Sequence, residues 1–116
     1  MELKIKKRTL IIIAILIAAI LVIIFTNKGS SVSATDQLAK CIASKSVVYI
    51  QTGCSACKAQ EDLFGDSYQY INDIDCVTDR SSCEEAGITA TPTWVINNQK
   101  YVGVQYLDRL KELTGC

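Results

Sequence analysis

An unbroken apolar run from Thr9 to Phe25 divides this chain into parts that cannot share one core. As a helix the run would be about 25 Å long, near the shortest length that crosses a membrane. Lys7, Arg8 and Lys28 flank it and could reach the interface on either side. A buried core helix is a poor alternative because the run is apolar on every side. We therefore expect residues 9–26 to form a transmembrane anchor.

The charges before this run predict its orientation. Basic side chains crowd the start of the chain, at Lys4, Lys6, Lys7 and Arg8. Because positive flanks remain in the cytoplasm, residues 1–8 are expected as a cytoplasmic tail, with the rest of the chain facing outside. A cleavable signal peptide is the alternative, since Val32-Ser33-Ala34 resembles a cleavage site after small residues. Both interpretations export the domain that follows.

The exported part has room for one small domain. Residues 27–35 are small and polar and predict a flexible tether, which leaves residues 36–116 for the domain. Six cysteines are dense for a cytosolic protein of 116 residues and suit an oxidising compartment. The sequence has no basic patch interleaved with aromatic residues, so nucleic acid is not expected as a partner.

Helical and β-type segments alternate along this domain and predict an α/β fold with one mixed sheet. Gly65 and Gly87 are expected to end the two middle helices, Thr35 or Asp36 to cap the first, and Ser81 or Ser82 to cap the third. The expected helices are 36–44, 54–64, 79–86 and 107–114. The expected strands are 46–51, one within 68–75, and 93–96 and 100–102, the last two joined by a hairpin at residues 97–99.

A Cys-x-x-Cys pair, Cys54 and Cys57, follows the first strand directly. This places Cys54 in the first turn of a helix, where free N–H groups and the helix dipole favour the reactive thiolate. Cys57 lies one turn further in. The pattern predicts a reversible dithiol–disulfide centre, with an inert structural disulfide as the alternative. A zinc site would need a second such pair or histidines, and the chain has no histidine, so no metal is expected.

The only proline of the chain, Pro92, follows Thr91 and directly precedes a predicted strand. Proline permits a cis peptide bond. Together with the upstream Cys-x-x-Cys, this Thr-Pro resembles the cis-proline loop of the thioredoxin superfamily. The resemblance implies a thioredoxin-like sandwich in which Cys54 and Cys57 are catalytic and Thr91 and Pro92 position an extended substrate. No cofactor is expected.

A more specific resemblance rests on two longer motifs. They are Gln60-x-x-Leu63-Phe64-Gly65 and Cys83-Glu84-Glu85-Ala86-Gly87-Ile88-Thr89-x-x-Pro92-Thr93-Trp94. Both look like the thioredoxin-like domain associated with bacterial vitamin K epoxide reductase homologues. The resemblance implies a membrane-tethered, extracytoplasmic thiol–disulfide oxidoreductase that exchanges disulfides between a quinone-linked membrane enzyme and exported cysteine-containing proteins.

The chain departs from that pattern around the cysteines. Gly53 replaces an aromatic residue, and Ser55-Ala56 replaces Pro-His. A histidine there would stabilise the thiolate and make the disulfide more oxidising, so the direction of electron flow stays open. The second hypothesis for the whole chain is an exported binding module whose Cys54–Cys57 bond is inert.

The other four cysteines can pair in three ways. Cys76 and Cys83 are close in sequence with a turn between them and can meet, and the resemblance also implies an upstream partner for Cys83. That leaves Cys41 to pair with Cys116. Cys76–Cys83 could instead relay electrons to the Cys54–Cys57 pair. The carboxylates of the helices are expected on solvated surfaces; they are Glu61, Asp62, Glu84 and Glu85.

Overall fold

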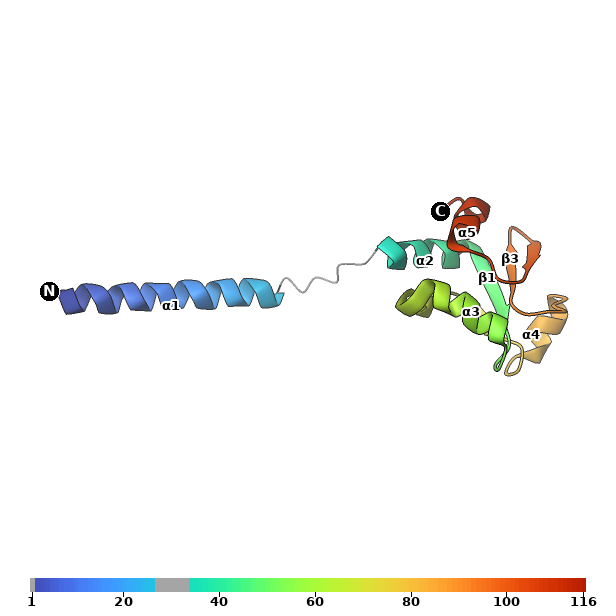
Figure 1. The fold of residues 1–116 in the computed structure, drawn as a ribbon, viewed down its shortest axis with the longest axis horizontal. Coiled ribbons are helices and arrows are strands. Elements are labelled where there is room, and N and C mark those ends of the chain that lie inside the picture. Colours follow the sequence, from blue (N-terminus) through green and yellow to red (C-terminus); the bar gives the residue numbers. More distant parts are fainter. Residues whose placement is uncertain (1, 27–33) are drawn as a thin grey trace. The chain divides into compact units, whose positions relative to one another are not determined.

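The computed structural model describes residues 2–26 and 34–116, and the chain divides into two units after Ser31 (Figure 1). Met1 and residues 27–33 lie outside the described residues. The predicted tether therefore falls largely outside them, as does most of the candidate cleavage segment, Val32-Ser33-Ala34. The two units are described separately.

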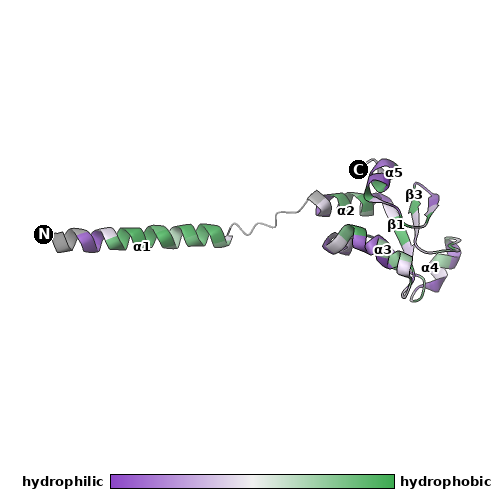
Figure 2. Cartoon of the chain, in the orientation of Figure 1, coloured by the Kyte–Doolittle hydropathy of each residue, from purple (hydrophilic) through white to green (hydrophobic). Residues whose placement is uncertain are grey.

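The described part of the first unit, residues 2–26, is one helix, α1 (Glu2–Thr26). Its segment Lys6–Thr26 is long and apolar enough to cross a membrane by length and composition. Figure 2 shows apolar residues on all visible sides of this segment beyond its basic start. The helix also includes the basic residues that the sequence assigned to a separate tail. The N-terminal apolar helix expected from the run Thr9–Phe25 is thus present.

The second unit is an α/β domain whose helices and strands follow the predicted order. Its helices are α2 (Ala34–Lys45), α3 (Ser55–Phe64), α4 (Arg80–Glu85) and α5 (Leu107–Thr114), with a 3₁₀ helix η1 (Gly65–Tyr70) after α3. Its strands are β1 (Ser46–Ile50), β2 (Asp73–Asp75), β3 (Thr93–Ile96) and β4 (Gln99–Val102).

The strands form one mixed sheet in the order β2-β1-β3-β4. β1 runs parallel to β2 and antiparallel to β3, which in turn pairs antiparallel with β4. The parallel crossover from β1 to β2 passes through α3, and the antiparallel pair β3–β4 closes as a hairpin. This topology is a thioredoxin-like α/β fold, as the sequence predicted.

One face of the sheet forms the centre of the core. Val48 on β1 stands opposite Trp94 on β3, and both are fully buried. Phe64 of α3 packs against the Trp94 ring at 6.2 Å. Other buried members of this cluster come from α2, α3 and α5, which lie on the same side of the sheet in Figure 1: Ala39, Ile42, Cys57 and Leu110. Tyr49, on the opposite face of β1, is only half-buried.

Two predicted helix starts differ from the structure. α2 begins at Ala34, so the helix takes in the last residues of the predicted tether. α4 is capped by Asp79 rather than by Ser81 or Ser82: the Asp79 carboxylate accepts from the Ser82 N–H at 3.2 Å and the Ser82 hydroxyl at 2.7 Å. An ionised carboxylate can accept both bonds at once, and a serine at this position could not do this as well.

The hairpin between β3 and β4 is tighter than expected. Asn97 and Asn98 both have positive φ, 52° and 62°, and form a two-residue turn, so Gln99 already belongs to β4. Asparagine tolerates this left-handed conformation better than other residues that carry a Cβ. The expected end of α3 matches the structure, where Gly65 follows the helix with φ 57°.

Two disulfides connect segments of the domain. Cys41 of α2 is bonded to Cys116, with the Cα atoms 6.0 Å apart, and Cys76 is bonded to Cys83 with a separation of 5.7 Å. These are the pairings expected from the sequence. The first joins the first helix of the domain to the residues after α5, and the second joins the end of β2 to α4. Cys54 and Cys57 remain as thiols.

Candidate functional site

A short turn between β1 and α3 sets the position of Cys54. The Cys54 N–H donates to the Gln51 carbonyl at 3.0 Å, and Gly53 between them has φ 85°. A residue with a side chain would be strained at that φ. Glycine here lets the chain turn directly from the buried strand into the helix, with Cys54 as the N-cap residue of α3.

Asp75, at the end of β2, stabilises this turn through hydrogen bonds. Its carboxylate accepts the Thr52 hydroxyl, the Thr52 N–H at 3.2 Å and the Val77 N–H at 2.9 Å. These bonds, first of all the one from the Thr52 hydroxyl, hold the pKa of Asp75 below its usual range. The carboxylate therefore stays ionised and keeps the segment before Cys54 in place.

The Cys54 sulfur is surrounded by hydrogen-bond partners. It accepts the Cys57 N–H at 3.1 Å and the Thr91 hydroxyl at 3.6 Å, and it lies 3.7 Å from the Thr91 carbonyl. Burial acts to raise the pKa of this thiol, but hydrogen bonds from Cys57 and Thr91 outweigh it, so the pKa of Cys54 is lowered. Cys54 is also half-exposed, so the sulfur favoured as thiolate is the one that solvent can reach.

Cys57 has the opposite character. Only 2% of its surface is exposed, because it sits on the inner face of α3 within the core. Burial raises the pKa of its thiol, and the hydrogen bond to Cys54 raises it further. The two cysteines thus differ in both access and acidity, as the helix position predicted.

Thr91 contacts the Cys54 sulfur, and Pro92 follows it in the chain. The Thr91–Pro92 peptide bond is cis, and Pro92 is fully buried directly before β3. The Pro92 carbonyl accepts the Gly103 N–H at 2.8 Å, which joins this loop to the end of β4. The contacts of Thr91 with the Cys54 sulfur bring together two loops that are far apart in the sequence.

Gln60 fixes the helix that carries the pair. Its side chain is fully buried. The Gln60 Oε1 accepts the Trp94 indole N–H at 2.9 Å and the Gln105 N–H at 2.7 Å, while Nε2 donates to the Gln105 carbonyl at 3.0 Å. One amide thus joins α3 to β3 and to the segment before α5. In the sequence Gln60 stands out only as part of a motif, although a polar residue among the core-facing positions of α3 is a sign of such a role.

Two pockets lie next to the cysteine pair. The larger, about 530 Å³, is lined by both Cys54 and Cys57 and also by Lys58, Glu61 and Asp75. The second, about 290 Å³, shares Gln51 with it and is lined by Thr91 and by both members of the Cys76–Cys83 disulfide. The second disulfide therefore borders the same loop that contacts Cys54. Its use as an electron relay stays a prediction.

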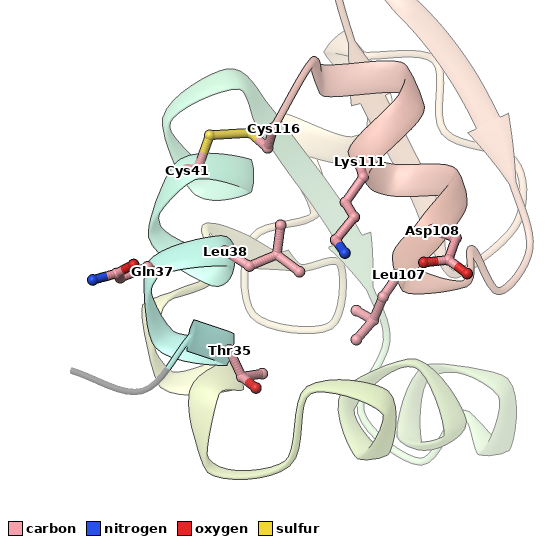
Figure 3. A pocket seen from close by; sticks show the side chains of 8 residues that line it. All are labelled: Thr35, Gln37, Leu38, Cys41, Leu107, Asp108, Lys111 and Cys116. Carbon is pink, nitrogen blue, oxygen red and sulfur yellow. A yellow bond between two sulfur atoms is a disulfide. The ribbon is translucent and has the colours of Figure 1, made fainter. Parts of the chain in front are cut away.

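A third pocket, about 510 Å³, lies between α2 and α5. In Figure 3 Leu38 and Leu107 point toward each other across it, Lys111 lies above them, and the Cys41–Cys116 disulfide closes one end. Its cysteines are bonded to each other, and neither Cys54 nor Cys57 lines it. We assign it no part in thiol chemistry. Across residues 2–26 and 34–116 no three His, Cys, Asp or Glu side chains form a group that could hold a metal ion.

Comparison with known proteins finds a relative that matches part of this chain. No protein-family model matches the chain. The thiol-disulfide oxidoreductase LTO1 of Arabidopsis thaliana is 32% identical over 71 residues, a match that covers 53% of this chain and 19% of LTO1. The chain therefore spans about a fifth of the length of this relative.

Solved structures that are similar to part of this chain include the following two. The oxidised thioredoxin of Plasmodium falciparum is 18% identical with a TM-score of 0.45, over 68% of this chain and 88% of that one. The NTD_N/C domain of the alkylhydroperoxide reductase AhpF of Enterococcus faecalis is 17% identical with a TM-score of 0.46, over 74% of this chain and 46% of that one.

Proposed function

We propose that this chain is a membrane-tethered, extracytoplasmic thiol–disulfide oxidoreductase in which Cys54 attacks and Cys57 resolves. The observation that carries the proposal is the asymmetry of the pair. The Cys54 sulfur is half-exposed, has a lowered pKa and contacts Thr91, whereas Cys57 is buried with a raised pKa. A structural disulfide has no need of such a difference, and thiol exchange depends on it.

The exchange can run in either direction. With the pair oxidised, a substrate thiolate attacks the Cys54 sulfur, a mixed disulfide forms and Cys57 leaves as a thiolate. A second substrate thiol then releases the substrate as a disulfide, and the pair gains two electrons. In reverse, the Cys54 thiolate attacks a substrate disulfide and Cys57 displaces the reduced substrate. Because the chain has Ser55-Ala56 and no Pro-His between the cysteines, the reduction potential of the pair must be measured to give the preferred direction of electron flow.

Thr91 and Pro92 give the substrate a place to lie. In the reduced form the Thr91 carbonyl lies 3.7 Å from the Cys54 sulfur and can accept a hydrogen bond from the thiol. Once Cys54 is bonded to a substrate, that carbonyl is free to accept an N–H from the substrate backbone, in the manner of an added strand. Pro92 has no N–H of its own, so it leaves this edge of the loop without a competing donor.

The partners belong to the same proposal. The helix Lys6–Thr26 would hold the domain at the outer face of the cell membrane. From there it would exchange disulfides with exported cysteine-containing proteins and with a quinone-linked membrane enzyme of the vitamin K epoxide reductase type. The identity of 32% to a protein named as a thiol-disulfide oxidoreductase supports the chemistry, over a small part of that protein's length.

The rival function is an exported binding module with an inert Cys54–Cys57 bond. Two observations argue against it. The other four cysteines are bonded in pairs, whereas Cys54 and Cys57 are thiols. The contacts around Cys54 also stabilise the reactive form of the sulfur rather than shielding it.

Trapping of mixed disulfides tests the proposal. Cells that express the full chain with Cys57→Ser are quenched with acid and examined on a non-reducing gel, beside Cys54→Ser and the double variant. Cys57→Ser should accumulate disulfide-linked complexes with exported proteins, and Cys54→Ser should accumulate far fewer. If neither variant traps any protein and the wild-type pair resists mild reductant, the inert-bond function is correct.

Quinone dependence tests the membrane partner separately. Membranes that contain the reduced wild-type chain should reoxidise the Cys54–Cys57 pair faster when an oxidised quinone is added. The same addition should leave Cys54→Ser membranes unchanged. An equal rate with and without quinone would refute the quinone-linked partner and leave the oxidoreductase chemistry untouched.

A further inference from the structure

The proton of Cys57 loses a nearby acceptor during the reaction. In the dithiol form the two sulfurs share a hydrogen bond, so the Cys54 thiolate can take this proton. In a mixed disulfide the Cys54 sulfur is covalently bonded and no longer carries the charge. Cys57 must still be deprotonated before it attacks, because the thiolate is the nucleophile. Resolution therefore calls for another base close to a buried thiol.

The core of the domain offers no such base. Among residues 34–116, the buried polar side chains are all non-ionisable: Ser46, Gln60, Ser67, Thr93 and Thr114. A proton acceptor for Cys57 must then come from the pocket that Cys57 lines.

Glu61 lines that pocket together with Cys57. It lies four residues later on α3, so the two side chains are neighbours on one face of the helix, with Cβ atoms about 5–6 Å apart. Glu61 and Cys57 also share a neighbour, the phenol of Tyr68. Burial raises the pKa of Tyr68 most, Asp73 raises it next, and Glu61 and Cys57 both contribute. The pocket, about 530 Å³, has room for a water molecule to bridge the carboxylate and the thiol.

Asp75, the other carboxylate in this pocket, is a poor base. It already accepts bonds from Thr52 and Val77, and these hold its pKa below the usual range. Its oxygens point into the turn that they stabilise. If Asp75 took a proton, those hydrogen bonds would weaken. Asp75 therefore holds the turn before Cys54 in place and does not transfer protons.

The other charged or titratable side chains near Cys57 already have partners of their own. Lys58 pairs with Asp62 at 2.8 Å, and both are largely exposed. The Tyr68 hydroxyl donates to Asp73 at 3.0 Å, and its raised pKa keeps it protonated. Glu61 also lines the pocket, and among residues 2–26 and 34–116 no hydrogen bond or ion pair occupies its carboxylate.

We propose that the Glu61 carboxylate accepts the Cys57 proton when Cys57 attacks a mixed disulfide, and returns it in the reverse reaction. The proposal rests on the oxidoreductase function above and differs from the solvated role that the sequence predicted for Glu61. In this step a Cys54–Cys57 bond forms and the bond from Cys54 to the substrate breaks. The substrate sulfur leaves with the electron pair as a thiolate, and the proton passes to Glu61.

The test separates the two steps of exchange in the full-length chain in detergent. The reduced protein is mixed in a stopped-flow instrument with dithiobis(nitrobenzoate), which releases one coloured thiolate when Cys54 attacks it. A second is released when Cys57 resolves the mixed disulfide. The rate of each phase is measured against pH for the wild type, Glu61→Gln and Asp62→Asn. Asp62→Asn is the matched control, because it removes one negative charge from the same helix at a residue that does not line the pocket.

We expect the second phase of Glu61→Gln to be slower than wild type by about tenfold or more below about pH 7. Its rate should rise tenfold per pH unit, as expected for attack by thiolate formed in solvent, and meet the wild-type rate at alkaline pH. The wild-type profile should be flatter. Added acetate should speed the second phase of Glu61→Gln and leave the wild type unchanged, an effect that a purely structural role would not produce. Asp62→Asn should match the wild type.

Each other outcome overturns the proposal. Identical pH profiles for Glu61→Gln and the wild type, with both phases present, would refute the role of Glu61 and leave the oxidoreductase function standing. If Asp62→Asn slows the second phase as much as Glu61→Gln does, the effect comes from the loss of negative charge on α3, and Glu61 is not the proton acceptor. A wild-type protein with no second phase would refute the proposed function itself, and the role of Glu61 with it.

Discussion

The backbone N–H of Cys57 donates a 3.1 Å hydrogen bond to the sulfur of Cys54. The resolving residue thus stabilises the charge on the attacking one through an atom that side-chain substitution leaves in place. This is why Cys57→Ser is a suitable trapping variant: it removes the resolving thiol and retains a main-chain contribution to the acidity of Cys54.

The first prediction concerns the pH dependence of Cys54 reactivity. Because its pKa is lowered, Cys54 should remain partly thiolate at acidic pH and react with iodoacetamide where an ordinary thiol does not. Thr91→Val removes a hydroxyl that donates to this sulfur at 3.6 Å. The pKa should then rise, and alkylation at about pH 6 should slow several-fold.

Mass spectrometry of the alkylated peptide gives this rate directly. Thr89→Val is the control, since it makes the same change in the same loop at an exposed hydroxyl. Equal slowing by both variants would mean that loop packing, rather than the Thr91 hydrogen bond, sets the acidity of Cys54.

The second prediction concerns stability. Gln60→Leu keeps the approximate size of the side chain but leaves the Trp94 indole N–H and the Gln105 N–H without their acceptor. Buried donors left unpaired are costly, so the free energy of unfolding should fall by about 2–4 kcal/mol. Urea unfolding followed by the fluorescence of Trp94, the only tryptophan, measures this change.

Gln69→Leu provides the comparison for this experiment. Gln69 is exposed on η1 and its amide reaches only the nearby Asp66 carbonyl, so its loss should cost less than about 0.5 kcal/mol. Similar losses for the two variants would show that the buried amide contributes no more than a surface one.

The third prediction ranks the two structural disulfides. Cys41–Cys116 spans 75 residues and Cys76–Cys83 spans 7. In the chain-entropy model, replacing both cysteines by serine should cost about 4.5 kcal/mol for the long loop and about 2.5 kcal/mol for the short one. Urea unfolding with Cys54 and Cys57 reduced measures both. The reverse ranking would mean that native-state packing around α4 outweighs loop length.

The fourth prediction concerns topology. With the basic residues before Thr9 on the cytoplasmic side, every cysteine of the chain should face outside. After reduction of intact cells, a membrane-impermeant maleimide should label Cys54. A cytosolic cysteine protein in the same cells should be labelled only after lysis. Labelling of Cys54 that also requires lysis would refute the exported orientation.

Much of the fold could be predicted because each signal was local. The β-branched run of β1, the leucines of α5 and the glycine after α3 each specify their own element with little help from the rest of the chain. The sequence placed β2 less sharply, within 68–75, because β2 is only three residues long and follows a 3₁₀ helix, so it carries little periodicity of its own.

The candidate site also has a part that the sequence predicts and a part that only the structure shows. Cys54, Cys57 and Pro92 stood out as a motif, but the bonds that tune them join residues distant in sequence. Asp75 bonds Thr52 from the end of β2, and no local pattern around this half-buried aspartate indicates that partner. Glu61 looked like part of a solvated helix face because its pocket is formed by tertiary packing, which a pattern along one helix does not contain.

Gln60 has a consequence for how other proteins meet this domain. Its amide neither gains nor loses a proton in the physiological range and takes no part in thiol oxidation, so the bonds that mount α3 on the sheet are the same throughout the reaction cycle. The surface around the pair should therefore keep one shape whether the sulfurs are joined or free. A partner that accepts one redox state and rejects the other must then distinguish them at the Cys54 sulfur itself, by its charge and its bond.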